Sequence, residues 1–279
     1  MKHFEDFFNG YDSTKLYYQV WRPDKDPKAI LQIVHGLGEY STRYKNVVDA
    51  LVPKGYIIYA SDLRGHGKSE GDKAFVKKIE DYVEDQKIFT QLILEKEKES
   101  KLPIFLLGHS MGSIISKIYV GSEQTIFKGL ILSGAGTAVG GSTNAILRAF
   151  AKLASILSPK SMISPNINGS DVSHDAQVIK NYDEDPLILK KITVRLGSEL
   201  LRGNKLANKV TPNIQIPTLV QFGSEDKLIL GGQELENLMT TKDKTIKQYV
   251  GLKHEVYNEI EEQRKLVLND LLTWLNNHL

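Results

Sequence analysis

Two patterns of apolar positions alternate along the chain. Short apolar runs, several of them continuous, are typical of strands buried on both faces of a sheet. They occupy residues 29–36, 56–62, 103–110, 128–135, 217–224 and 245–251. A further strand is predicted at residues 15–21, and Glu5–Phe8 precedes it as its partner, with a turn near Asn9-Gly10.

Helix-length segments separate these runs. In the segment 76–100 the apolar side chains fall on one helical face, namely Ile79, Tyr82, Val83, Phe89, Leu92 and Ile93. Near the C-terminus Val267, Leu271 and Leu275 recur at steps of four, again on one face. The alternation predicts an α/β fold with a mostly parallel sheet of about eight strands and helices on both faces.

One region departs from this alternation. Residues 137–206 contain no convincing strand but include the amphipathic stretch 144–157, where Ile146, Phe150, Leu153 and Leu157 share a face. A helical insertion there would form a cap over the carboxyl ends of the strands, where open α/β sheets bind ligands. The sequence therefore predicts a core of residues 1–136 and 207–279, and a helical cap or lid of residues 137–206.

Composition narrows the class of protein. The chain has 279 residues, 41% hydrophobic and 25% charged, which is ordinary for a globular protein. A net charge of +2 gives no sign that nucleic acid or an anionic membrane is the main partner. The absence of cysteine excludes disulfides, cysteine–zinc sites and a cysteine nucleophile. No histidine cluster has metal-ligand spacing, so we predict neither a metal nor a cofactor.

The N-terminal stretch MKHFEDFFNG mixes acidic and aromatic residues and is not typical of a signal peptide. No apolar run approaches the ~18 residues of a membrane span. We therefore expect a cytoplasmic protein, and leave open a peripheral contact with membranes. The sequence does not indicate the oligomeric state.

The stretch GHSMG, residues 108–112, has the G-x-S-x-G form of a nucleophile elbow. In such an elbow a serine hydroxyl stands at the tip of a strand, and a helix starts directly behind it. The turn is so sharp that side chains two positions before and after the serine would collide, and Gly108 and Gly112 remove that collision. A strand-like run precedes Ser110 and a helix-like run follows it, so Ser110 is the candidate nucleophile.

A serine nucleophile needs a general base and an acid that orients it. In the order serine, acid, histidine that is typical of this motif, His254 follows the strand-like run 245–251, whereas His278 is the penultimate residue. Asp226 follows the apolar run 217–224 and is the candidate acid, with Glu225 as the fallback. One β–α unit separates Asp226 from His254, which would bring them to neighbouring strand ends.

An oxyanion hole completes the predicted site. The residue after the nucleophile, Met111, offers one backbone N–H, and Leu37 in the glycine-rich loop His35-Gly36-Leu37-Gly38 offers the other. Each such donor lowers the reaction barrier by roughly 3 kcal/mol. His35 and His109 flank the site and could shape it. In the stretch 62–69 we expect a turn held by a contact between Asp62 and Arg64.

The stretches HGLGEYSTRY, SDLRGHGKSEG, GHSMGS, FGSEDKLI and GLKHEVYNE resemble the monoacylglycerol lipase / lysophospholipase group of serine hydrolases, within the α/β-hydrolase superfamily. SHDAQVIKNYDEDPLI resembles the cap of that group. The resemblance implies an α/β-hydrolase fold and esters of medium- or long-chain acids as substrates. It also implies the roles given above to Ser110, Asp226, His254, Leu37 and Met111. Two positions depart from the group: Tyr40 stands where its members often have a histidine, and Ser113 stands where a third glycine is common.

These observations predict a serine hydrolase that cleaves monoacylglycerol or lysophospholipid to fatty acid and alcohol through an acyl-enzyme on Ser110. His35, Gly36, Tyr40 and His109 are expected to contact the substrate. We leave open transient contact of the cap with membranes or micelles.

Several alternatives remain: a carboxylesterase, thioesterase or aminopeptidase of the same fold, an acyltransferase, or a ligand-binding protein without catalysis. An aminopeptidase would need carboxylates in the cap, for which Asp183, Glu184 and Asp185 are available.

Overall fold

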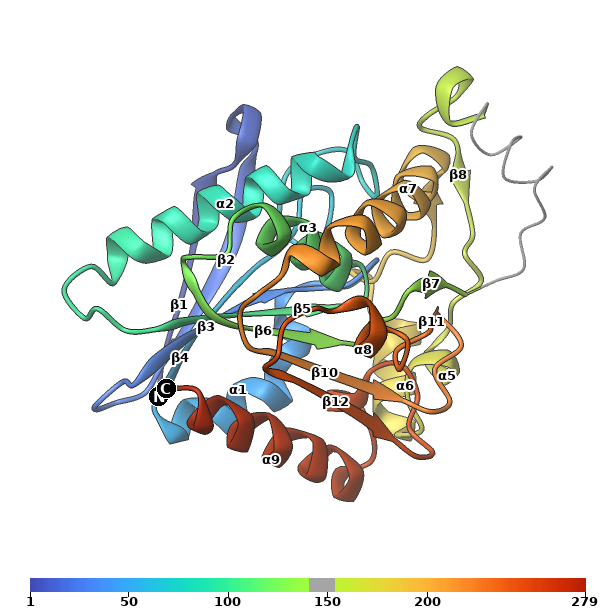
Figure 1. Cartoon of the computed structure of the whole chain (residues 1–279). Helices are drawn as coiled ribbons and strands as arrows, with labels where there is room; N and C mark the ends of the chain where they lie inside the picture. The colour runs from blue at the N-terminus through green and yellow to red at the C-terminus, as the bar shows by residue number, and fades with distance from the viewer. Residues whose placement is uncertain (141–153) are drawn as a thin grey trace.

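A mostly parallel sheet of eight strands forms the centre of the protein (Figure 1). The computed structural model describes residues 1–140 and 154–279. In spatial order the strands are β1 (Lys2–Asn9), β2 (Lys15–Arg22), β4 (Tyr56–Ser61), β3 (Ala29–Val34), β5 (Ile104–His109), β6 (Phe127–Ser133), β10 (Thr218–Gly223) and β12 (Lys244–Tyr249). β2 is antiparallel to both of its neighbours, and all other neighbouring strands are parallel. The predicted fold class and strand order along the chain are confirmed.

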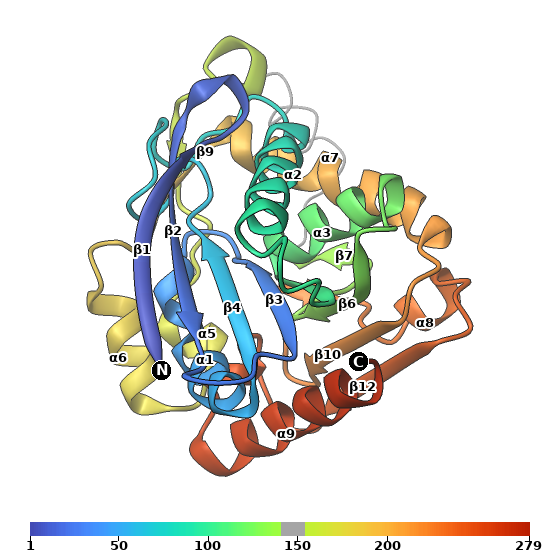
Figure 2. The same ribbon diagram turned by 90° about the vertical axis from the view of Figure 1, so that its left-hand side faces the viewer.

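Helices cover both faces of the sheet, as the apolar runs predicted (Figures 1 and 2). The described α-helices are α1 (Lys45–Leu51), α2 (Ile79–Lys96), α3 (Met111–Ser122), α5 (Gly169–Val172), α6 (Ala176–Glu184), α7 (Val194–Val210), α8 (Leu235–Leu238) and α9 (Glu261–Asn277). Short 3₁₀ helices are η1 (Tyr11–Ser13), η2 (Ser41–Tyr44), η3 (Val52–Lys54), η4 (Thr211–Asn213) and η5 (Val256–Asn258). One apolar cluster joins α1 and α9 to the sheet, and another joins α2, α3 and α7 to the opposite face. Every residue of β3, β4 and β5 is buried, because helices lie above and below them.

The described part of the region between β6 and β10 contains α5, α6 and α7, as well as three strands of two residues each that the sequence did not predict. β7 (Ala138–Val139) pairs with β11 (Ile229–Leu230), and β8 (Met162–Ile163) pairs with β9 (Ile192–Thr193). Strands this short carry no measurable alternation of apolar and polar residues, so no pattern could indicate them.

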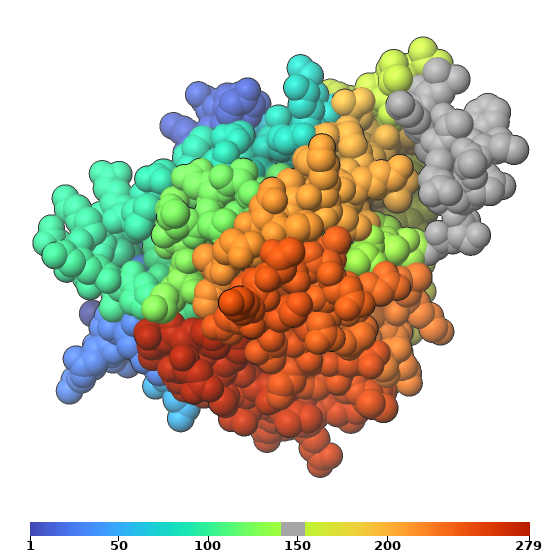
Figure 3. All heavy atoms as spheres, viewed as in Figure 1, coloured from blue at the N-terminus to red at the C-terminus, as the bar shows by residue number. Residues whose placement is uncertain are grey.

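The predicted amphipathic helix lies mostly outside the described residues, including Ile146, Phe150 and Leu153. Leu157, which is described, is 75% exposed. The predicted cap boundary at residue 206 falls within α7, which runs to Val210 and packs against α3. In the space-filling view α7 forms a ridge across this side of the molecule (Figure 3).

The described helices include none that is both long and apolar enough to cross a bilayer. Among the same residues, no cluster of three or more His, Cys, Asp or Glu side chains could hold a metal ion.

Candidate active site

Ser110 occupies a sharp turn between β5 and α3, as the G-x-S-x-G motif predicted. Its backbone has φ +52° and ψ −118°, a conformation that residues other than glycine rarely adopt. A Cβ on Gly108 would lie 2.4 Å from the carbonyl oxygen of Gly112. A Cβ on Gly112 would lie 2.0 Å from the carbonyl oxygen of Val34, so here the obstacle is the neighbouring strand β3. Both glycines are therefore required for this turn.

Asp226 and His254 lie in the loops that follow β10 and β12. These strands are parallel neighbours, so their carboxyl ends bring the two loops together. Asp226 Oδ2 lies 2.7 Å from His254 Nδ1, and both residues are buried. Asp226 Oδ1 accepts hydrogen bonds from the N–H groups of Leu228 (2.8 Å) and Ile229 (3.1 Å). The fallback acid, Glu225, faces His174 instead, at 3.4 Å.

The charges of this pair determine the protonation state of the imidazole. Burial lowers the pKa of His254, but the charge and hydrogen bond of Asp226 outweigh burial and leave the pKa above its ordinary value. Burial raises the pKa of Asp226, yet attraction to His254 and the two backbone N–H groups bring it below its ordinary value. Asp226 is thus ionised at neutral pH and holds the proton of His254 on Nδ1, leaving Nε2 as the basic nitrogen.

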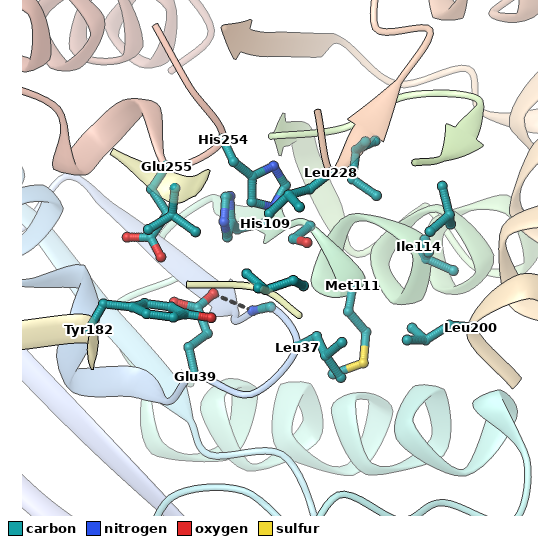
Figure 4. Close-up of a pocket in the computed structure, with 16 residues that line it drawn as sticks. Leu37, Glu39, His109, Met111, Ile114, Tyr182, Leu200, Leu228, His254 and Glu255 are labelled. Carbon is teal, nitrogen blue, oxygen red and sulfur yellow. Dashed lines mark hydrogen bonds between the residues drawn. The ribbon is translucent and has the colours of Figure 1, made fainter. Parts of the chain in front are cut away.

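Ser110 and His254 line one cavity beneath the region that follows β6 (Figure 4). It holds about 610 Å³ of empty space, part of it open to solvent. Most of its lining is apolar, namely Leu37, Met111, Ile114, Val139, Ile167, Val172, Leu200, Leu228 and Ile229. In the close-up Glu39, Tyr182 and Glu255 lie on one side, whereas Met111, Ile114 and Leu200 lie on the other. The cavity therefore has a polar end and an apolar end.

The two predicted oxyanion donors also line this cavity. Met111 is the first residue of α3, so its N–H has no carbonyl partner within the helix. Neither this N–H nor that of Leu37 makes a hydrogen bond to any described residue. The neighbouring Gly36 N–H donates to Glu39 Oε1 at 2.5 Å, which fixes the loop that carries Leu37.

A buried network that the sequence reasoning missed supports this loop. Arg43 Nη2 lies 2.5 Å from Glu255 Oε2, and Arg43 Nε lies 3.5 Å from Glu39 Oε2. The Tyr44 hydroxyl donates to Glu39 Oε1 at 2.9 Å. Burial, together with the nearby Glu255 charge, raises the pKa of Glu39. The spacing of Glu39 and Arg43 by four residues could have indicated their contact. Their third partner, Glu255, could not be found in this way, because it is 212 residues from Arg43.

Two of the four residues expected to contact substrate line the cavity, Gly36 and His109. His35 does not, because its ring is held by Gly36 O (2.8 Å from Nδ1) and by the N–H of Leu63 (2.8 Å from Nε2). Tyr40 faces a different groove, where its hydroxyl donates to Asp185 Oδ2 at 2.7 Å. This geometry corrects the expectation that His35 and Tyr40 contact substrate.

Other expectations also need correction. Arg64 does not contact Asp62; it pairs with Asp85 at 2.7 Å and with Asp12 at 3.2 Å. Asp62 instead accepts from the N–H groups of Ser41 and Lys68, both at 2.8 Å. The turn exists as predicted, but backbone donors hold the Asp62 side chain.

The carboxylates suggested for an amine-binding site in the cap do not line the cavity. Asp183 accepts a hydrogen bond from the N–H of Gly169, while Glu184 and Asp185 line the same groove as Tyr40. Ser113, at the position of the frequent third glycine, donates from its hydroxyl to Ser110 O at 2.7 Å.

A serine at a strained strand–helix turn and a buried Asp–His pair at neighbouring strand ends are typical of one class. The fold and the site define a serine hydrolase of the α/β-hydrolase fold, and the protein is an ester hydrolase of this class.

Comparison with known proteins identifies the family. Residues 25–261 match the family of serine aminopeptidases, S33. The chain is 32% identical to a monoacylglycerol lipase of Mycolicibacterium smegmatis over 99% of this chain and 98% of that protein. It is 29% identical to a monoglyceride lipase of Rattus norvegicus over 96% of this chain and 89% of that protein. The crystal structure of a Paleococcus ferrophilus monoacylglycerol lipase matches with a TM-score of 0.82 and 27% identity over 95% of this chain and 99% of that one. The chain belongs to the S33 family and, within it, to the monoacylglycerol lipase group.

Proposed function

We propose that this enzyme hydrolyses esters of lipids with a single acyl chain, with monoacylglycerol as the first candidate and lysophospholipid as the second. The observation that carries the proposal is a single cavity, polar at one end and apolar at the other, that Ser110 and His254 both line. The relatives named as monoacylglycerol and monoglyceride lipases support the same substrate class.

In the proposed mechanism Ser110 attacks the ester carbonyl while Nε2 of His254 takes its proton. The oxyanion of the tetrahedral intermediate binds the N–H groups of Leu37 and Met111. His254 then gives the proton to the leaving alcohol, and an acyl-enzyme remains on Ser110. Water, deprotonated by His254, attacks the acyl-enzyme and releases the fatty acid. Asp226 holds the imidazole in place and stabilises its protonated form.

The two ends of the cavity suggest how the substrate lies. The apolar end, with Met111, Ile114 and Leu200, suits an acyl chain, since each buried CH₂ contributes about 0.8 kcal/mol. The polar end, with Glu39 and Tyr182, suits an alcohol that carries further hydroxyl groups. Gly36, in the oxyanion loop, and His109, directly before Ser110, lie where these two loops meet, and both are proposed to contact the ester.

Other reactions of this fold make different demands. An aminopeptidase needs an unpaired carboxylate for the substrate amine, but Arg43 already pairs with both carboxylates that line the cavity, Glu39 and Glu255. A thioesterase or an acyltransferase would use the same residues and differ in substrate or acceptor. Assays with an acyl thioester, with added alcohol and with an amino-acid p-nitroanilide distinguish these reactions from ester hydrolysis.

The decisive test combines a substrate panel with the Ser110→Ala variant. The wild type should hydrolyse monoacylglycerol and p-nitrophenyl octanoate, and a fluorophosphonate probe should label it. Ser110→Ala should lose more than about 10³-fold of the activity and all labelling, while keeping its melting temperature. Near-normal turnover by this variant would exclude Ser110 as the nucleophile. Strict preference for acetate esters would contradict the lipid substrate.

We also propose that the enzyme is cytoplasmic and touches membranes or micelles transiently through the region after β6. Four exposed apolar side chains between residues 156 and 163 support this contact: Ile156, Leu157, Met162 and Ile163. Sedimentation with lipid vesicles measures it.

A further inference from the structure

The first strand, β1, forms an outer edge of the eight-stranded sheet, and no other described strand pairs with its free side (Figure 2). Seven of its eight residues are exposed, and only Phe8 is buried. Exposed edges of this length are templates for pairing with another strand. Two large aromatic side chains stand on this edge, Phe4 at 51% and Phe7 at 42% exposure.

The backbone groups available on this edge can be identified. The N–H of Gly10 donates to Thr14 O across the hairpin, at 2.8 Å. Even-numbered residues of β1 therefore point their backbone groups at β2, and odd-numbered residues point theirs outward. In agreement, the N–H of Phe7 bonds only the Asp6 side chain, at 2.8 Å. The backbone groups of His3 and Glu5 point outward in the same way and bond no other described residue.

The side chains on this edge form a self-complementary series. If two copies of β1 pair antiparallel about a twofold axis through Phe4, then Lys2 stands opposite Asp6 of the second copy, and His3 opposite Glu5. Phe4 meets Phe4 of the second copy, on the side of the sheet where Phe8 packs. The Lys2–Asp6 and Phe4–Phe4 pairs are favourable between strands. The side chains of His3 and Glu5 keep their own partners, Gln19 and Lys68, while the backbone groups of these two residues face each other.

Other registers lack this match. A twofold axis through Glu5 would set Glu5 opposite Glu5 of the second copy. An axis through Asp6 would set Asp6 opposite Asp6 of the second copy. Charged side chains ordinarily protect an edge strand from pairing, but this order of charges favours pairing in one register. Lys2, moreover, has no ion-pair partner among the described residues, so its ammonium group is available.

We propose that β1 is a dimerisation strand, which joins two copies of the protein into one continuous antiparallel sheet with Lys2–Asp6 pairs on each side of the Phe4 contact. The twofold symmetry makes every contact occur twice, as in other isologous dimers. The interface is short, so we expect a dissociation constant in the micromolar range.

Charge exchange tests the register directly. Lys2→Asp would set an aspartate against Asp6 at both ends of the interface, and Asp6→Lys would set a lysine against Lys2 at both ends. In analytical ultracentrifugation of untagged protein, each single variant should therefore dimerise at least about tenfold more weakly than the wild type. The double variant K2D/D6K should dimerise as the wild type does. A mixture of the two single variants should form a heterodimer, because its opposing residues are again of opposite charge.

Activity on p-nitrophenyl octanoate and the melting temperature show that each variant is folded, since none of these residues lines the catalytic cavity. Lys15→Asp, an exposed charge change on the paired strand β2, serves as the control and should leave dimerisation unchanged. A monomeric wild type throughout the micromolar range would overturn the proposal. So would a dimer that all the variants form equally well, since another surface would then hold it.

Discussion

The hydrogen bond between Asp226 and His254 decides which imidazole nitrogen is basic. Because the pKa of His254 lies above its ordinary value, the neutral form required of a base is lost as the pH falls through that raised pKa. The wild-type kcat/KM should therefore be constant at high pH and decline as the pH falls through the raised pKa of His254.

Asp226→Asn removes the charge that raises the pKa but leaves the imidazole buried. We expect kcat to fall about 10⁴-fold, because the amide favours the wrong tautomer. The acid limb of the remaining kcat/KM should move to lower pH, since only the smaller effects of Glu255 and Glu39 then oppose the burial that lowers the pKa of His254. Initial rates with p-nitrophenyl octanoate across the pH range measure both effects. An unchanged limb would show that another group controls it.

Residues close to a motif were predictable, whereas their distant partners were not. Ser110, Asp226 and His254 each follow an apolar run, and parallel strands bring such positions to one edge. Arg64, in contrast, pairs with Asp85 across 21 residues of sequence, and a local pattern could only suggest its neighbour Asp62. His35 was expected to contact the substrate because it begins the loop that carries Leu37, but both of its ring nitrogens form hydrogen bonds with backbone groups.

A completely buried carboxylate, Glu259, helps to hold the loop between β12 and α9. Glu259 accepts from the N–H of Lys253 at 2.7 Å and from the N–H of His174 at 2.9 Å. It is completely buried, and Lys253 directly precedes the proposed base. Glu259 therefore joins the His254 loop to the segment before α6, and we infer that it is a positioning residue.

Glu259→Gln keeps the size of the side chain but replaces one acceptor by an amide donor, which would face a backbone N–H. We expect unfolding free energy to fall by about 1–3 kcal/mol. The value of kcat should fall more than KM rises, since misplacement of His254 affects the transition state most. Glu262→Gln, on the exposed side of α9, is the matched control. Loss of stability with unchanged kcat would limit Glu259 to a structural role.

At the scale of helices and strands, the long elements were predictable, because periods of 2 and 3.6 residues are visible over six or more positions. α2 lies within the predicted segment 76–100, and α9 contains the predicted stripe of Val267, Leu271 and Leu275. The short ladders β7–β11 and β8–β9 were not predictable, since tertiary packing and not local pattern determines them.

At the scale of the whole molecule, exposed apolar side chains lie in the region between β6 and β10, which also contributes residues to the lining of the cavity. Residues 154–163, yellow-green in Figure 3, protrude from the body of the protein. Leu157 is 75% exposed and Ile163 is 44% exposed, and such exposure is unfavourable in water but not against lipid. We therefore expect the enzyme to bind vesicles weakly, with this region oriented toward the lipid.

Leu157→Ser and Ile163→Ser together should reduce the vesicle-bound fraction several-fold, because two apolar side chains lose their burial in lipid. Hydrolysis of a short, fully dissolved ester should stay unchanged, since neither residue lines the cavity. Leu266→Ser removes a comparable side chain, 58% exposed on α9 at the opposite end of the molecule in Figure 1, and should leave binding unaffected. Equal loss with all variants would mean that binding depends on general hydrophobicity and not on this region. Unchanged binding of the double variant would remove residues 156–163 from the membrane contact and leave the catalytic proposal intact.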